Sequence, residues 1–316
     1  MWLLRWLIRR DYWGSPLRVA IWFVNAQRQR LLLTKLRPSL GYPAGTGSFR
    51  SMSVQASENR TLFILGAGNS VNELGPDQFA EIDANFSIGV NVWVAHPFVP
   101  NMYSLEGGGF PVSFEEQTHR RFLADELDRN SKVEKAPGVI QLAPRHPHSP
   151  TQIVSVAGEA LTRSTLVGRV NLPKAMSLRG LDRDLRAVLR GLRLGLVPDG
   201  VLPDCGATVV RLIFLGFQRG FKRIVLVGVD LSDSPYFWCS DHLSPRFEKL
   251  RELFPRPAAT EHDTVSTFNR PYSAKDFILR LTNELRRGYG VKVFVGSQAS
   301  SLATSLGVFP WASETR

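Results

Sequence analysis

The chain has 316 residues, a net charge of +11, 43% hydrophobic residues and 21% charged residues. This composition is that of a folded protein and excludes an intrinsically disordered one. The two cysteines, Cys205 and Cys239, lack Cys or His partners at ligand spacing, which excludes a disulfide framework and a zinc site. No apolar run reaches about 18 residues, so we expect no transmembrane helix, and we predict no signal peptide.

Residues 1–40 form a basic and aromatic arm with eight basic residues and one acidic residue, a net charge of +7. Trp2, Leu3, Trp6 and Leu7 are spaced for one face of a helix. Tryptophan beside arginine is typical of a helix that lies on an anionic membrane. Packing on the body of the protein, or a contact between copies in a homo-oligomer, is the alternative. No nucleic-acid-binding module follows the arm, so we expect no nucleic acid partner.

Residues 41–59 are rich in Gly, Ser and small polar residues and are predicted to be a linker. The folded domain should therefore comprise residues 60–316. Its first strand, near residues 61–65, runs into the turn Gly66-Ala67-Gly68-Asn69-Ser70. A strand, a Gly-rich turn and a helix favour an anion, because backbone N–H groups and the helix dipole point at it. A plain tight turn is the alternative, since the third glycine of the dinucleotide fingerprint is missing.

Polar residues also mark the ends of the next two predicted strands. Residues 86–94 are an apolar run that contains Asn91, and Ser104 lies in a third strand that precedes three glycines. A buried Asn needs hydrogen-bond partners. Asn91 is therefore either a structural residue or a contact to a base or sugar.

A helix and a buried strand follow within residues 204–230. Asp204, Cys205 and Gly206 open the helix, and an apolar strand ends at Asp230. Such an apolar run indicates a strand buried on both faces of a parallel sheet. Ligands of open α/β sheets bind at the carboxyl ends of strands and the amino ends of helices, so we expect Asp230 and Cys205-Gly206 to lie together there.

The remaining pattern predicts helices and strands in alternation. The predicted helices lie at residues 115–129, 179–194, 246–254 and 272–289, and the predicted strands at residues 138–143 and 291–296. The polar segment at about residues 232–272 fits a lid over the edge of the sheet. The fold class is therefore α/β, with a Rossmann-like, mostly parallel sheet, helices on both faces, a lid insertion and the basic N-terminal arm.

Three segments resemble the bacterial sialyltransferase family of the Campylobacter type and the related motility-associated-factor and pterin-pyrophosphokinase-like proteins. These segments are FILGAGNSVNEL, DCGATVVRLIFLGFQRGFKRIVLVGVD and VKVFVGSQASSLA, and the resemblance covers roughly residues 60–310. It implies a glycosyltransferase that uses a CMP-activated sialic acid or related ulosonic acid, acts on a cell-surface glycan or lipid-linked acceptor, and needs no metal cofactor.

The resemblance also assigns residues on matching positions. It implies donor contacts at Gly66, Gly68 and Ser70 of the Gly-rich turn, at Asn91, and at Asp204, Cys205 and Gly206 of the turn before the long helix. Asn69 in the Gly-rich turn, and Ser104 and Asp230 near the ends of predicted strands, complete the predicted donor-binding set. Ala67 stands where the family has an asparagine, and Ser232 where it has a first lid tyrosine. Tyr236 matches the second tyrosine, which contacts the leaving phosphate.

The chemistry of transfer needs a base for the acceptor hydroxyl, and a histidine is suited to it near neutral pH. His262 and His242 are the candidates, while Arg256 and Arg270 could join Tyr236 in stabilising the leaving group. Asp230 and Asp233 could instead hold a divalent metal. A Mg²⁺-dependent pyrophosphokinase and a non-catalytic nucleotide-sugar-binding protein therefore stay open. Localisation is expected in the cytoplasm, at the inner face of the cytoplasmic membrane.

Overall fold

A single parallel sheet forms the centre of the computed structural model. Eight strands pair in the described part of the chain, in the order β6-β5-β4-β3-β2-β1-β7-β8, with every neighbouring pair parallel. Their bounds are Thr61–Leu65 (β1), Phe86–Val90 (β2), Met102–Leu105 (β3), Gly138–Leu142 (β4), Ser164–Asn171 (β5), Val201–Asp204 (β6), Arg223–Val227 (β7) and Lys292–Val295 (β8). The structure describes residues 14–39, 61–105, 122, 125, 126, 129, 138–142, 164–173, 175, 177–232, 235–239, 247–253 and 272–312.

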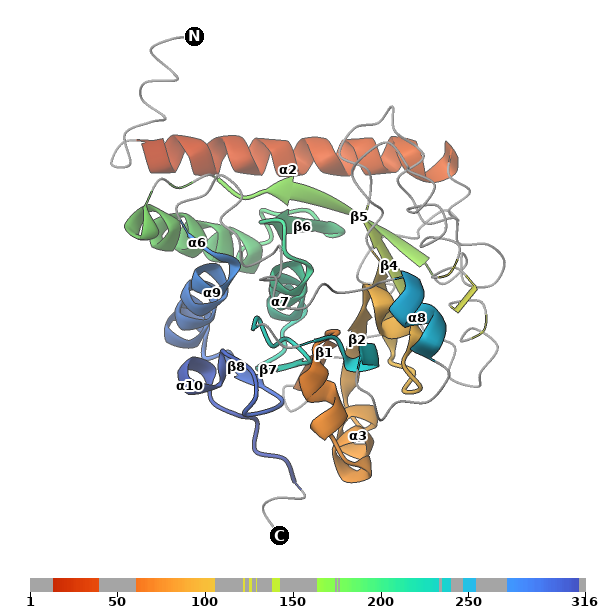
Figure 1. The fold of residues 1–316 in the computed structure, drawn as a ribbon. Coiled ribbons are helices and arrows are strands. Elements are labelled where there is room, and N and C mark those ends of the chain that lie inside the picture. Colours follow the sequence, from red (N-terminus) through yellow and green to blue (C-terminus); the bar gives the residue numbers. More distant parts are fainter. Residues whose placement is uncertain are drawn as a thin grey trace.

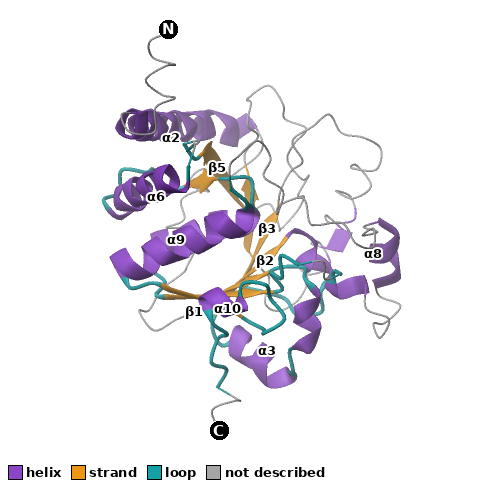
Figure 2. Ribbon diagram, turned by 60° about the vertical axis from the view of Figure 1, so that its left-hand side comes forward, coloured by secondary structure: helices purple, strands orange, loops and turns teal. Residues whose placement is uncertain are grey.

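The strands carry apolar residues on both faces, as the sequence predicts for a sheet covered by helices. In β1, Leu62 and Ile64 join one core cluster, whereas Phe63 and Leu65 join the other. Figure 2 shows the helices on either side of the strands. The first cluster lies under helices α2 (Gly14–Ser39), α6 (Leu178–Arg193), α7 (Thr208–Gln218) and α9 (Ala274–Tyr289). The second lies under α3 (Pro76–Asp83), α8 (Glu248–Leu253) and the segment near Trp311.

The helix ends follow local sequence signals. Ser177 caps α6 by accepting a hydrogen bond from the Gly180 N–H at 3.1 Å. Ser273 and Asp276 form a reciprocal capping box at the start of α9. Gly290 ends α9 at φ 68°, a left-handed conformation that a glycine adopts without strain. Short α10 (Ala303–Leu306) then follows β8.

Helix α2 is part of the folded body (Figure 1). It packs on β5, β6 and α6. Trp22, Ala26 and Leu33 are buried in the first core cluster. Buried Arg18 pairs with Asp184 of α6 at 3.5 Å. The inner face of residues 14–39 therefore packs on the body, which was one of the alternatives for the arm. Residues 1–13 and the predicted linker at 41–59 lie outside the described residues.

One strand boundary departs from the sequence prediction. β2 ends at Val90, and Asn91 begins a 3-10 helix, η2 (Asn91–Ala95), at φ 47°. The prediction of a strand through residue 94 was therefore wrong. Asparagine tolerates a positive φ better than most residues because its short polar side chain can hydrogen-bond locally. The apolar residues Trp93 and Val94 are buried by the 3-10 turn instead of by strand pairing.

Candidate functional site

The Gly-rich turn after β1 lies at the point where the sheet order reverses. From β1 the chain builds β2 to β6 on one side, and then β7 and β8 on the other. In open α/β sheets ligands bind at the carboxyl edge at such a switch point. Gly66 and Gly68, which follow β1, therefore meet Gly228, which follows β7, at the edge where a ligand is expected.

The two glycines permit a close approach of two backbones. The Gly66 N–H donates to the Val227 carbonyl at 2.7 Å, and the Gly68 N–H donates to the Gly228 carbonyl at 2.8 Å. A Cβ on Gly66 would stand 2.6 Å from the Gly228 oxygen, closer than real side chains come. These glycines are thus needed for packing against β7, and the plain structural alternative accounts for them without a ligand.

Asp230 holds the following residues of the turn. Its buried carboxylate accepts hydrogen bonds from the Ser70 N–H at 3.1 Å and from the Ser70 hydroxyl. A carboxylate at a helix N-terminus is stabilised by the exposed N–H groups there, and Asp230 takes this position at the 3-10 helix η1 (Asn69–Glu73). The Val71 N–H donates to the Gly68 carbonyl. The N–H groups of Gly66, Gly68, Ser70 and Val71 therefore all donate to acceptors within the protein. This corrects the prediction that the N–H groups of the turn cradle a phosphate.

The same contacts bear on the predicted metal site. Both carboxylate oxygens of Asp230 accept hydrogen bonds from Ser70, an arrangement that fits a clamp on the turn rather than a metal ligand. Asp233 lies outside the described residues. Among the residues that the structure describes, no group of three or more His, Cys, Asp or Glu side chains could hold a metal ion.

The segment that follows β7 crosses the Gly-rich turn. Tyr236 forms an antiparallel bridge with Gly68, and the Phe237 N–H donates to the Ala67 carbonyl at 2.9 Å. The Asn72 side chain donates to the Phe237 carbonyl at 3.0 Å. The Tyr236 ring stacks on Trp238 with centroids 4.4 Å apart. Residues 235–239, within the segment predicted to be a lid at about residues 232–272, are therefore bound directly to the turn.

An aromatic cluster packs against Phe237 of this crossing segment. The Phe237 ring packs edge-on against Trp93, His96 and Phe247, with centroids 5.2 to 5.8 Å apart. His96 stacks on Trp93 at 4.2 Å, and its Nδ1 accepts a hydrogen bond from the Phe98 N–H. The sequence analysis did not select His96. Its place between Trp93 and Phe98 in an apolar stretch could have indicated a packed ring.

Asn91 and Ser104 lie at the carboxyl ends of two adjacent strands of the sheet. Val90 is in register with Ser104, so Asn91 follows at the carboxyl end of β2 beside the end of β3. Ser104 is buried and Asn91 is half-buried. Both predicted residues thus lie at the carboxyl edge, on the strands next to β1, and their contact with a donor stays a prediction.

Asp204, Cys205 and Gly206 lie at a different part of the sheet. β6, which ends at Asp204, and β7 are separated by five strands in the sheet order. Asp230 and Cys205-Gly206 follow strands that end at the same edge of the parallel sheet. These strands are not neighbours, so the structure does not bring the two sites together as expected. Helix α7 links the two regions, because it starts at Thr208 and packs Gly216 against Leu62 of β1 and Ile224 of β7.

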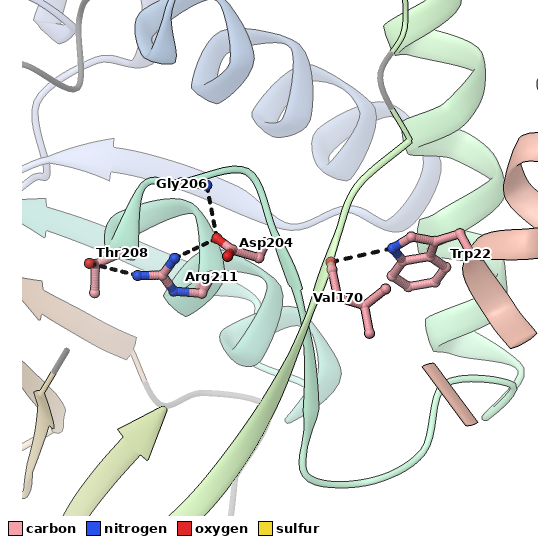
Figure 3. A network of polar contacts seen from close by, with 6 residues as sticks. All are labelled: Trp22, Val170, Asp204, Gly206, Thr208 and Arg211. Atoms are coloured by element: carbon pink, nitrogen blue, oxygen red, sulfur yellow. Dashed lines mark hydrogen bonds and ion pairs between the residues drawn. The ribbon is translucent and has the colours of Figure 1, made fainter. Parts of the chain in front are cut away.

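A buried ion pair organises the turn between β6 and α7 (Figure 3). Arg211 Nη1 lies 2.5 Å from Asp204 Oδ1, and both side chains are fully buried. The same Asp204 oxygen accepts a hydrogen bond from the Gly206 N–H at 2.8 Å, and Arg211 Nη2 donates to the Thr208 hydroxyl at 2.9 Å. Burial lowers the pKa of Arg211 to about 10, so the guanidinium is still charged at neutral pH. We therefore assign Asp204 and Arg211 to holding the N-terminus of α7 in place. The sequence analysis did not select Arg211.

Polar residues after β8 complete this part of the edge. The Ser297 hydroxyl donates to the carboxylate of Glu73, at the end of η1. The Ser300 hydroxyl donates to the Val229 carbonyl at 2.8 Å, and the Ser301 N–H donates to the Asp230 carbonyl at 2.9 Å. The loops after β1, β7 and β8 are therefore joined into one hydrogen-bonded unit. His242, His262, Arg256 and Arg270 lie outside the described residues, so their predicted roles stay predictions.

The fold and the site define a class: a parallel α/β protein whose candidate ligand site lies at the switch point, beneath a segment that crosses from β7. Comparisons with family models and with curated proteins find no match. The chain is similar in structure to the sialyltransferase CstII from Campylobacter jejuni in complex with the substrate analogue CMP-3FNeuAc, at 15% identity and a TM-score of 0.42 over 80% of this chain and 87% of that chain.

Two further solved structures show a similarity of the same extent. One is CST-II in complex with a trisaccharide acceptor and CMP, at 16% identity and a TM-score of 0.41 over 80% of this chain and 87% of that chain. The other is the monofunctional alpha-2,3-sialyltransferase Cst-I from Campylobacter jejuni, at 14% identity and a TM-score of 0.43 over 80% of this chain and 82% of that chain.

The close approach of Gly68 to Asp230 gives a testable prediction. We expect Gly68→Ala to lower the free energy of unfolding by about 1–3 kcal/mol, because the added Cβ overlaps the Asp230 carboxylate and stands 2.8 Å from the Gly228 oxygen. Gly75→Ala is the matched control, since its Cβ would meet only the end of Gln78 at 3.8 Å. Urea unfolding of both variants measures the difference, and an equal effect of the two would contradict the assigned packing role.

Proposed function

We propose that this protein is a glycosyltransferase that moves a sialic acid or a related ulosonic acid from a CMP-activated donor to a cell-surface glycan or lipid-linked acceptor. The observation that supports this proposal is the bridge between Gly68 and Tyr236. It joins the turn that the sequence resemblance assigns to the donor with the tyrosine that the resemblance assigns to the leaving phosphate. Asn91, a further predicted donor residue, directly follows the neighbouring strand β2 at the same edge.

The contacts of the turn specify how it would serve a donor. Because the N–H groups of Gly66, Gly68 and Ser70 already donate within the protein, the turn is a rigid support rather than a phosphate cradle. Side chains such as Asn69 and Tyr236 would then contact the charged phosphate. A preorganised support lets such side chains act without rearrangement as charge develops on the leaving group.

The reaction itself is a substitution at the anomeric carbon of the donor sugar. The acceptor oxygen forms a bond to this carbon while the bond from the carbon to the phosphate oxygen breaks, and CMP departs with the electron pair. The acceptor proton passes to a base, for which His262 and His242 are the predicted candidates. Tyr236, bound beside the Gly-rich turn, is proposed to donate a hydrogen bond to the departing phosphate.

A panel of nucleotides tests the donor class. We expect CMP to raise the melting temperature while UDP, GDP and ATP leave it unchanged, with or without Mg²⁺ or Mn²⁺. A ligand that binds only the folded state adds about 2.7 kcal/mol at roughly 100 times its Kd, which corresponds to a shift of several degrees. Stabilisation by UDP with Mn²⁺ alone would contradict the CMP proposal, and stabilisation by ATP with Mg²⁺ alone would favour a pyrophosphokinase.

Activity separates an enzyme from a binding protein. With CMP-activated donor, the wild-type chain should release CMP and transfer the sugar, whereas a chain that binds CMP without either reaction would be a nucleotide-sugar-binding protein. His262→Ala and His242→Ala, compared under the same conditions, identify the base as the variant that loses transfer and keeps the CMP-induced shift.

A further inference from the structure

The outer face of α2 carries apolar residues that nothing in the described structure covers. Ile21, Val24 and Leu31 are exposed there, with Val24 at 53% and Leu31 at 64%. Exposed Arg28 and Lys35 continue the same line, because positions 21, 24, 28, 31 and 35 are spaced for one face of a helix. The inner face is also apolar, through Trp22, Ala26 and Leu33. A helix that is apolar on two opposite faces indicates a second apolar neighbour.

A second element extends this surface. Leu194 and Leu196, in the turn that follows α6, are exposed at 66% and 50%. The Gln27 side chain donates to the Leu196 carbonyl at 3.0 Å, which fixes this turn beside α2. The Phe23 ring lies directly against Gly191 of α6, where a Cβ would overlap it. The outer face of α2 and the turn at residues 194–196 therefore form one docking face.

The charge of the docking face is positive. The sequence contains no Asp or Glu between Asp11 and Glu58, so α2 carries none. Arg18 is neutralised by Asp184, whereas Arg28, Arg30 and Lys35 are exposed. Arg190 and Arg193 lie in the last turn of α6, next to Leu194; they also favour the helix dipole there. Two copies of this face would bring like charges together, which disfavours a pair of chains.

We propose that the docking face binds the surface of a lipid bilayer that contains anionic lipids. Leucine, isoleucine and valine side chains would enter the boundary between headgroups and acyl chains, while the arginine and lysine side chains pair with anionic headgroups. The thirteen residues that lead into α2, MWLLRWLIRRDYW, have the same basic, aromatic and aliphatic composition. No helix in the described part of the chain is long and apolar enough to cross a membrane. The proposed binding to the bilayer surface does not depend on the proposed donor.

Vesicle sedimentation with the full chain tests this docking face. We expect binding to phosphatidylcholine vesicles that contain phosphatidylglycerol, little binding to phosphatidylcholine alone, and release at high salt. The double variant Arg28→Gln/Lys35→Gln should weaken binding by about thirtyfold. Val24→Ser/Leu31→Ser should also weaken it, because less apolar area enters the interface.

A charge-matched variant and a measure of assembly complete the test. Lys249→Gln/Lys292→Gln removes the same charge from exposed positions of α8 and β8, which Figure 1 places away from α2, and should leave vesicle binding unchanged. Equal losses in both charge variants would overturn the proposal, because binding would then follow net charge alone. A wild-type dimer in sedimentation velocity that dissociates in Val24→Ser/Leu31→Ser, with vesicle binding unaffected, would assign the face to a second copy and also overturn it.

Discussion

Arg211→Met is expected to lower the free energy of unfolding by about 3–5 kcal/mol, because it leaves the Asp204 carboxylate buried without its counter-charge. Asp204 is fully buried, and its Oδ1 accepts from both Arg211 and the Gly206 N–H. The methionine side chain fills a similar volume, so the loss comes from charge rather than from a cavity. Urea unfolding measures the change.

Two further variants separate the ion pair from general effects of removing an arginine. Arg280→Met breaks the pair of Arg280 with Asp182, which has a distance of 2.7 Å but side chains that are 39% and 21% exposed. Exposed pairs contribute about 0–1 kcal/mol, so this control should change little. The double variant Asp204→Asn/Arg211→Met removes both charges and should recover part of the loss. An Arg211→Met effect no larger than that of Arg280→Met would contradict the assignment.

Trp22→Ala is expected to destabilise the protein by about 3–5 kcal/mol, the usual loss for a buried aromatic side chain. Trp22 is almost completely buried between α2 and the sheet, and its indole N–H donates to the Val170 carbonyl of β5 at 3.4 Å (Figure 3). Its ring also packs edge-on against Phe23 at 5.1 Å. The truncation therefore removes a large contact and leaves the Val170 carbonyl without this donor.

The matched control for Trp22 lies two residues away on the same helix. Val24→Ala changes an exposed side chain and should stay within about 0.5 kcal/mol. Urea unfolding followed by tryptophan fluorescence and by circular dichroism gives both values. A similar small effect in both variants would mean that α2 does not stabilise the body in solution.

Much of the sheet could be predicted from apolar runs. The strands at residues 61–65 and 223–227 are apolar on both faces, which predicts their type. The end of the second strand was predicted at Asp230, but β7 ends at Val227, directly before Gly228. The helix at Ala274–Tyr289 follows from its capping box and from Gly290. Apolar runs, capping residues and glycines act on neighbouring residues, so these elements can be predicted from one sequence.

The features that the sequence did not predict depend on backbone geometry and on the order of the strands, which an apolar pattern does not contain. Asn91 stands inside an apolar run that continues as if it were a strand, and only the backbone reveals the 3-10 turn. Arg211 lies within the apolar residues of α7, seven positions after Asp204, and the pairing needs the turn geometry between them. The sheet order separates β6 from β7, so residues close in sequence end up on strands that are not neighbours.

The engagement of the Gly-rich turn by Asp230 also could not be predicted from the sequence. Ser70 and Asp230 are 160 positions apart, and each is compatible with a ligand role when considered alone. The structure joins them, which converts two predicted donor residues into a support for the turn. In the proposed function, other side chains at this edge recognise the donor, and the nucleotide panel tests whether the nucleotide binds.

The position of α2 has a consequence for synthesis on the ribosome. Its buried residues pack against β5, β6 and α6, which end at Asn171, Asp204 and Arg193. Translation adds about 5–20 residues per second, so on the order of ten seconds pass between the synthesis of Leu33 and that of the strands that cover it. Throughout that time the nascent chain exposes Trp22, Ala26 and Leu33 together with the outer apolar residues of the same helix. The first described helix of this chain can therefore be buried only after β5, α6 and β6 have been made.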